Sequence, residues 1–149
     1  MKLKGFTLVE LLIVIAVIAI LAAVIYVAVD PATRFAQARN ADRWSSVNSV
    51  LNAYIKYMVD NDGAHPVTLS DDTYYMIGTA AGTCSAQSTG TNFIDLSGLT
   101  TKYIAEIPHD PELAGSEAYT NYYVQKDTNG RITIGSCDAE LGEDIKVTR

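Results

Sequence analysis

Apolar residues are distributed very unevenly along this chain. Residues 11–29 form an uninterrupted uncharged block dominated by Ile, Val, Leu and Ala, whereas the residues after Asp30 mix apolar and polar positions like an ordinary soluble domain. A helix of this length, at a rise of ~1.5 Å per residue, can cross the hydrocarbon core of a bilayer. The pattern therefore predicts a membrane segment followed by one globular domain.

A second helix is predicted over residues 33–60, because apolar residues recur there at three- and four-residue spacing. This stripe consists of Trp44, Val47, Leu51, Tyr54 or Ile55, and Met58. We expect the stripe to pack in the core, and we expect polar residues such as Arg39 and Arg43 to occupy the remaining surface. Gly63 predicts the end of the helix. Upstream, Pro31 either kinks a continuous helix or marks a local break in it.

Beyond residue 67 the pattern changes to short β-type runs at residues 73–77, 119–125, 131–135 and 145–147. The turn residues 127–130 between two alternating runs predict a hairpin, in which Tyr122 and Val124 share one face with Ile132 and Ile134 opposite them. A small antiparallel sheet on the amphipathic helix would bury both apolar faces. The predicted fold class is α+β, in which a long N-terminal helix, membrane-spanning and then amphipathic, packs against this sheet.

Charge and motifs argue against two classes of function. The chain has 11 basic and 17 acidic residues and a net charge of −6, so its bulk surface is not expected to attract nucleic acid. A local basic patch at Arg34, Arg39 and Arg43 is the alternative. The sequence lacks the G-x-S-x-G, H-E-x-x-H and phosphate-loop motifs, so we do not expect an enzyme. A membrane-tethered hydrolase is the rival hypothesis, and it would need a cleft with a perturbed acid or base.

The two cysteines, Cys84 and Cys137, both lie in the polar part of the chain. If that part lies outside the cytoplasm, a single disulfide is the natural interpretation. Their spacing does not resemble a metal site, since neither has a Cys or His partner nearby in sequence. The bond would tie a loop of small residues, 78–90, to the sheet.

The flanking charges and the length of the apolar block bear on whether it is a secretory signal or a membrane anchor. Lys2 and Lys4 precede the apolar block, which places the N-terminus in the cytoplasm. An ordinary secretory signal has a shorter apolar core and ends at a small-residue cleavage site, and this block instead runs into a second helical stretch. An ordinary anchor would avoid Glu10, because a carboxylate in the membrane is costly. Glu10 is therefore either functional or a residue at the membrane interface.

The run Lys4-Gly5-Phe6-Thr7-Leu8-Val9-Glu10 resembles the prepilin signal of type IV pilins and of the related pseudopilins of type II secretion. The resemblance implies a type IV pilin-like fold, cleavage by a prepilin peptidase between Gly5 and Phe6, and N-methylation of Phe6. It also implies that Glu10 pairs with the Phe6 amine of a neighbouring subunit. Because an unpaired buried carboxylate is costly, such a pair would favour the correct register between subunits.

The same resemblance implies an organisation for the chain. The leader peptide is residues 1–5, the transmembrane and filament-core helix is 6–30, the amphipathic half of the helix is 31–62, and the β-rich head is 63–149. The precursor would cross the cytoplasmic membrane once, with its N-terminus inside. A cytoplasmic assembly ATPase and an inner-membrane platform protein would then drive its incorporation into a homo-oligomeric filament.

Two kinds of filament fit this resemblance. An extracellular type IV pilus would support adhesion, motility or DNA uptake, and a periplasmic pseudopilus would support protein export. The predicted disulfide favours the pilin, which we prefer. The small sheet and the segment Ile107-Pro108-His109-Asp110-Pro111 favour the pseudopilin, because this segment resembles a stretch of the major pseudopilins of the G type.

Some of those pseudopilins bind calcium in the loops that follow this stretch. Here the hard oxygen ligands that would suit calcium are Asp110, Glu112, Glu117, Asp127 and Asn129. The alternative is a solvated acidic loop bounded by two prolines. No other metal and no organic cofactor is predicted.

Overall fold

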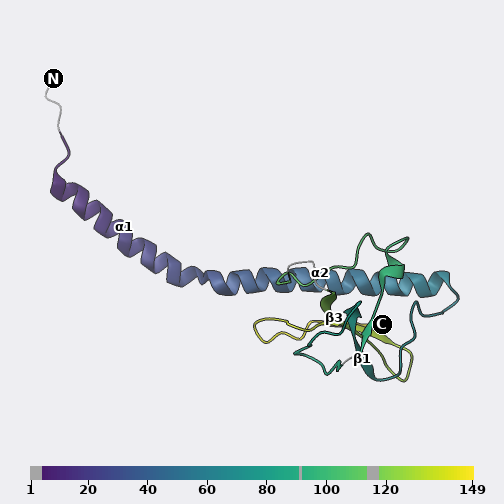
Figure 1. The fold of residues 1–149 in the computed structure, drawn as a ribbon. Helices are drawn as coiled ribbons and strands as arrows, with labels where there is room; N and C mark the ends of the chain where they lie inside the picture. Colours follow the sequence, from purple (N-terminus) through teal and green to yellow (C-terminus); the bar gives the residue numbers. More distant parts are fainter. Residues whose placement is uncertain (1–4, 91, 114–117) are drawn as a thin grey trace. The chain divides into compact units, whose positions relative to one another are not determined.

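The computed structural model describes residues 5–90, 92–113 and 118–149. The chain divides into two compact units, Met1–Phe35 and Ala36–Arg149. In chain order, the elements are α1 (Leu8–Val29), α2 (Pro31–Asp60), β1 (Thr73–Gly78), β2 (Phe93–Ile94), the short 3-10 helix η1 (Ser97–Leu99), β3 (Tyr119–Lys126), β4 (Ile132–Ser136) and β5 (Lys146–Thr148) (Figure 1).

The predicted membrane segment forms α1, a helix of 22 residues in which no residue is buried. Its length corresponds to ~33 Å, enough to span a bilayer core. Within the described part of the chain, this stretch alone is long and apolar enough to do so. α1 ends at Asp30, whose backbone is left-handed (φ 43°, ψ 73°), and Pro31 begins α2. The helical stretch is therefore broken at one residue, with proline in the first helical position, where its missing N–H is not needed.

In the second unit, α2 packs against a sheet (Figure 1). The sheet has five strands in the order β2-β1-β3-β4-β5. β1 pairs with β2 in parallel, and the other neighbours are antiparallel. The core between helix and sheet contains Val47, Val50, Leu51, Ala53 and Tyr54 from α2 and Tyr122, Val124, Ile132 and Ile134 from β3 and β4. The predicted α+β class is confirmed, and its layout is like that of type IV pilins.

The predicted hairpin is the connection between β3 and β4, with Val124 opposite Ile134. Asp127 organises the turn, since its Oδ1 accepts hydrogen bonds from the backbone N–H groups of Asn129 (2.9 Å) and Arg131 (2.8 Å). Gly130 has φ +81°, a conformation that glycine adopts without strain. β2 and η1 were not predicted, because a strand of two residues leaves no alternating pattern in the sequence.

The opposite face of the sheet carries a smaller cluster. Met76, Tyr123 and Cys137 are buried there. Tyr123 lies directly opposite Gly135 on β4, and a Cβ added at Gly135 would come within 2.4 Å of the Tyr123 ring. A glycine is therefore needed at this strand position to admit the aromatic ring.

Two expectations about α2 were wrong. Trp44 is not a core residue, since 38% of it is exposed, and Val50 and Ala53 fill the core face instead. Arg43 does not lie on the surface, because its side chain is completely buried. The helical period identifies which residues share a face, but it does not show that a buried arginine has acidic partners distant in sequence.

Candidate functional site

The predicted cleavage site lies in an accessible backbone segment. Gly5, Phe6 and Thr7 precede the first turn of α1 and have no regular secondary structure. Phe6 is 78% exposed, and no atom lies within 4 Å of the position that a Cβ on Gly5 would occupy. A peptidase must bind its substrate around the scissile bond, and both sides of the Gly5–Phe6 bond are open here. The geometry suits the predicted cleavage between these residues.

Glu10 belongs to the cap of α1. The Thr7 N–H and the Thr7 hydroxyl each donate to Glu10 Oε2 at 2.8 Å, and the Glu10 N–H donates to Thr7 Oγ1 at 3.2 Å. This is a capping box, which satisfies backbone donors that the first turn of a helix leaves unpaired. One Glu10 oxygen takes both Thr7 donors, so the carboxylate retains acceptor capacity for a further donor. The structure thus holds the Glu10 side chain close to residues 6 and 7, where the predicted new amine would form.

In the second unit, Arg43 forms the centre of a buried ionic cluster. Its Nε donates to Asp110 Oδ2 at 2.7 Å and its Nη2 to Asp110 Oδ1 at 3.0 Å, a bidentate pair. Nη1 donates to Glu140 Oε2 at 2.6 Å and to Asn40 Oδ1 at 3.0 Å, and Nη2 also donates to Glu112 Oε2 at 3.2 Å. All five N–H groups of this guanidinium are therefore used. We call Arg43 and these acidic partners the Arg43 clamp.

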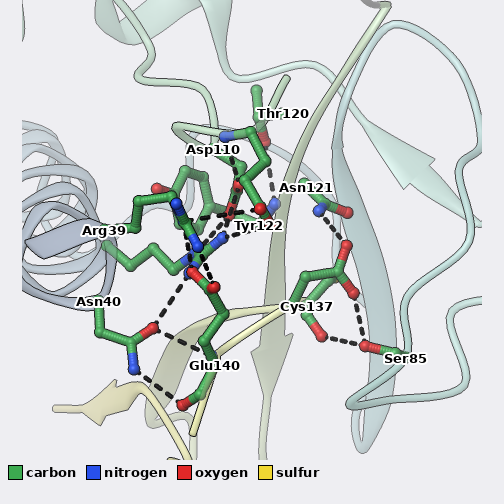
Figure 2. A network of polar contacts seen from close by, with 12 residues as sticks. Arg39, Asn40, Ser85, Asp110, Thr120, Asn121, Tyr122, Cys137 and Glu140 are labelled. Carbon is green, nitrogen blue, oxygen red and sulfur yellow. Dashed lines mark hydrogen bonds and ion pairs between the residues drawn. The ribbon is translucent and has the colours of Figure 1, made fainter. Parts of the chain in front are cut away.

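Neighbouring side chains complete the Arg43 clamp (Figure 2). Arg39 pairs with Glu140 through two nitrogens. Asn40 donates from Nδ2 to the Glu140 carbonyl at 2.8 Å and accepts the Glu140 N–H at 3.0 Å. The clamp thus ties α2 to two loops, one before β3 and one after β4.

The contacts within the Arg43 clamp shift the pKa values of Arg43 and Glu140. Burial by itself lowers the pKa of Arg43, but the hydrogen bonds and charges of Asp110 and Glu140 outweigh it and the pKa is raised overall. Hydrogen bonds from Arg39 and then from Arg43 lower the pKa of Glu140 to about 2. These groups therefore remain charged at neutral pH, and their arrangement is that of a structural clamp.

The residues considered for calcium do not gather in one place. The Asp110 and Glu112 carboxylates contact Arg43, whereas the Asp127 carboxylate and the Asn129 backbone are bonded to each other in the hairpin turn. Glu117 lies outside the described residues. In the part of the chain that the structure describes, no group of three His, Cys, Asp or Glu residues is placed to hold a metal ion. Calcium binding stays a prediction.

Cys84 and Cys137 form a disulfide, with Cα atoms 4.7 Å apart. Asp138, the residue after Cys137, adds polar contacts beside this disulfide to Ser85 and Asn121, which are labelled in Figure 2. Its carboxylate accepts hydrogen bonds from Ser85 Oγ and from Asn121 Nδ2, each at 2.5 Å. Asn121 has a left-handed backbone (φ 65°) within β3, and its carbonyl accepts the Cys137 N–H at 3.0 Å. The small-residue loop is thus fixed to the sheet by a covalent bond and by polar contacts.

The alternative of a basic patch for nucleic acid is not supported at two of its three residues. Arg43 is buried in the clamp and Arg39 is paired with Glu140.

The sequence contained only one signal for the clamp, the Pro-bounded Asp110. Asn40 and Glu140 were missed, because their partners lie about a hundred residues away along the chain.

Comparison with known proteins bears on the N-terminal segment. A family model described as the prokaryotic N-terminal methylation motif matches residues 1–26. No curated protein and no solved structure matches the chain significantly. The matched segment includes the exposed Gly5–Phe6 bond, the capping residue Glu10 and most of α1, and it includes none of the head. Residues 1–26 are therefore the prepilin signal shared by type IV pilins and pseudopilins.

Proposed function

We propose that this chain is a structural subunit of a type IV pilus-like filament rather than an enzyme. The observation that carries the proposal is α1, which follows the methylation motif directly and has no buried residue along its 22 residues. An apolar surface of that length is not stable in water. It must be covered by lipid before assembly and by other copies of α1 afterwards.

Processing would take place at the exposed bond. A prepilin peptidase cleaves between Gly5 and Phe6, and Phe6 is then N-methylated. The new amine lies one residue before Thr7, whose donors already hold the Glu10 carboxylate. In the filament, Glu10 accepts the amine of a neighbouring copy. This pairing neutralises both buried charges and fixes the axial stagger between subunits.

The precursor spans the cytoplasmic membrane with its N-terminus inside, as the flanking lysines favour. An assembly ATPase and an inner-membrane platform protein act as its partners in extraction. The filament is an extracellular pilus for adhesion, motility or DNA uptake. The disulfide fits a head outside the cytoplasm, where such bonds persist, and this holds for a pilus and for a periplasmic pseudopilus alike.

A pseudopilus of a type II secretion system is the second candidate. The observation that favours it is the segment resembling the G-type pseudopilins, whose Asp110 is fully buried against Arg43. Electron microscopy of producing cells separates the two. Long surface fibres support the pilus, and loss of protein export without surface fibres supports the pseudopilus.

The proposal is tested by producing the full chain in cells that contain a prepilin peptidase and an assembly system. We expect Glu10→Leu to be cleaved like the unaltered chain but to give far fewer filaments in the sheared fraction, because the amine then lacks its partner. Glu106→Leu, which removes an exposed carboxylate of the head, is the matched control and should assemble. An unaltered chain that is never cleaved, or a Glu10→Leu chain that assembles normally, contradicts the proposal.

A further inference from the structure

Two large apolar side chains of the head are exposed in the same part of its surface. Trp44 is 38% exposed and Leu141 is 52% exposed. Trp44 follows Arg43 on α2, and Leu141 follows Glu140, which contacts Arg43. Trp44 Nε1 also approaches Glu143 Oε2 at 3.4 Å, so the loop containing Leu141 lies along this part of the helix. We call these two residues the Trp44–Leu141 patch.

The backbone of Leu141 adds an independent observation. Its φ is 57°, in the left-handed region that a leucine adopts only with strain. Gly142 follows with φ +71°, so the tip of the loop is a left-handed turn that glycine or asparagine would form more easily. A strained leucine is understandable where its side chain fills a core, but this one is half exposed. Half of this side chain is therefore open to a contact from outside the subunit, and a backbone held in a strained conformation is often found where a residue serves binding.

The surroundings of the patch suit a second copy of the same chain. The head is rich in acidic residues, so two heads repel one another over most of their surface. The rim of the patch is of mixed sign, with the partly exposed cation Arg39 and the exposed carboxylates Glu112 and Glu143. An apolar centre with a polar rim of both signs can pair with an equivalent surface.

The covalent link between the head and α1 points to the same occupant. If copies associate through α1, each head is tethered to a helix that contacts its neighbours, so the effective concentration of other heads around it is high. We propose that the Trp44–Leu141 patch is a contact between the heads of neighbouring copies in the filament. This inference rests on the proposed function and adds a specific head surface to it.

The test uses Leu141→Gly in the full chain, because this change removes the side chain and relieves the strained backbone. We expect the thermal midpoint of the head to stay equal or rise, while the yield of sheared filaments falls severalfold and cleavage is unaffected. Val59→Ala is the control, since Val59 is an exposed apolar residue of the same helix that lies away from the patch. We expect it to leave the filament yield unchanged.

Trp44 supplies a second readout, because it is the single tryptophan of the chain. In filaments its emission should move to shorter wavelength, and its quenching by acrylamide should fall severalfold relative to the detergent-solubilised subunit. Filaments of normal yield from Leu141→Gly, or filaments in which Trp44 stays as open to quencher as in the subunit, overturn this inference alone. An unaltered chain that forms no filaments at all overturns the proposed function as well.

Discussion

Replacement of Arg43 by methionine is the most informative perturbation of the head. The methionine keeps an unbranched apolar side chain of similar length and removes the charge and all five donors. Asp110, which is also completely buried, would then lose its bidentate partner, and Glu140 would keep only Arg39. The change therefore leaves a carboxylate buried without a counterion.

The expected loss of stability in Arg43→Met follows from the complete burial of the Asp110 carboxylate. Removal of one partner of a buried ion pair destabilises a protein by about 3–5 kcal/mol, because the remaining charge is left uncompensated. For a head of this size, each kcal/mol corresponds to about 4 °C in the thermal midpoint, so we expect a fall of about 12–20 °C. Arg39→Met is the matched control, since its side chain is 32% exposed, and a surface pair of this kind contributes about 1 kcal/mol or less.

The assay is thermal unfolding of the full chain in detergent, followed by near-ultraviolet circular dichroism of the head's tyrosines. The double variant Arg43→Met with Asp110→Leu should recover part of the loss, because it removes the stranded carboxylate as well. Two results would contradict a buried, uncompensated Asp110: a thermal midpoint that Arg43→Met lowers no more than Arg39→Met does, or a double variant whose destabilisation equals the sum of those of the single variants.

Three further predictions concern the head. Glu140 has its folded pKa lowered from 4.5 to about 2, so its stabilising contribution is complete above pH ~4.5 and is lost as the pH falls toward ~2; Glu140→Gln should flatten the dependence of the thermal midpoint on pH over that interval. Reduction of the disulfide, which links residues separated by 53 positions, should lower the unfolding free energy in a denaturant titration by about 4 kcal/mol, and no change would contradict the entropic argument. Gly135→Ala should lower the unfolding free energy by about 1–3 kcal/mol, because the added methyl meets the Tyr123 ring, whereas Gly98→Ala, which meets no atom within 4 Å, should be tolerated; equal melting of both variants would contradict this.

Local patterns in the sequence predicted those parts of the fold that depend on neighbouring residues. The apolar block became α1, and the alternating runs around the turn at 127–130 became the β3–β4 hairpin. The same reasoning failed for Arg43 because it depends on partners far along the chain. Asp110 is 67 residues away and Glu140 is 97 residues away, and no local period reports that they converge.

Among the candidate site residues, those in one contiguous motif could also be predicted from the sequence, and those that depend on distant contacts could not. The N-terminal motif is contiguous, so Gly5, Phe6 and Glu10 could be identified from sequence alone, and the structure adds the role of Thr7 in holding Glu10. The calcium ligands were suggested by the resemblance of residues 107–111 to the G-type pseudopilins and by the acidic composition of the loops that follow. Composition does not show that the Asp110 carboxylate is occupied by an arginine and the Asp127 carboxylate by turn amides.

The most direct test of the central claim is mass spectrometry of the N-terminal peptide from sheared filaments of the unaltered chain. We predict that the filament subunit begins with N-methylated Phe6 and retains the whole of α1. Recovery instead of a secreted subunit that begins beyond Asp30, with the apolar helix removed, would contradict it.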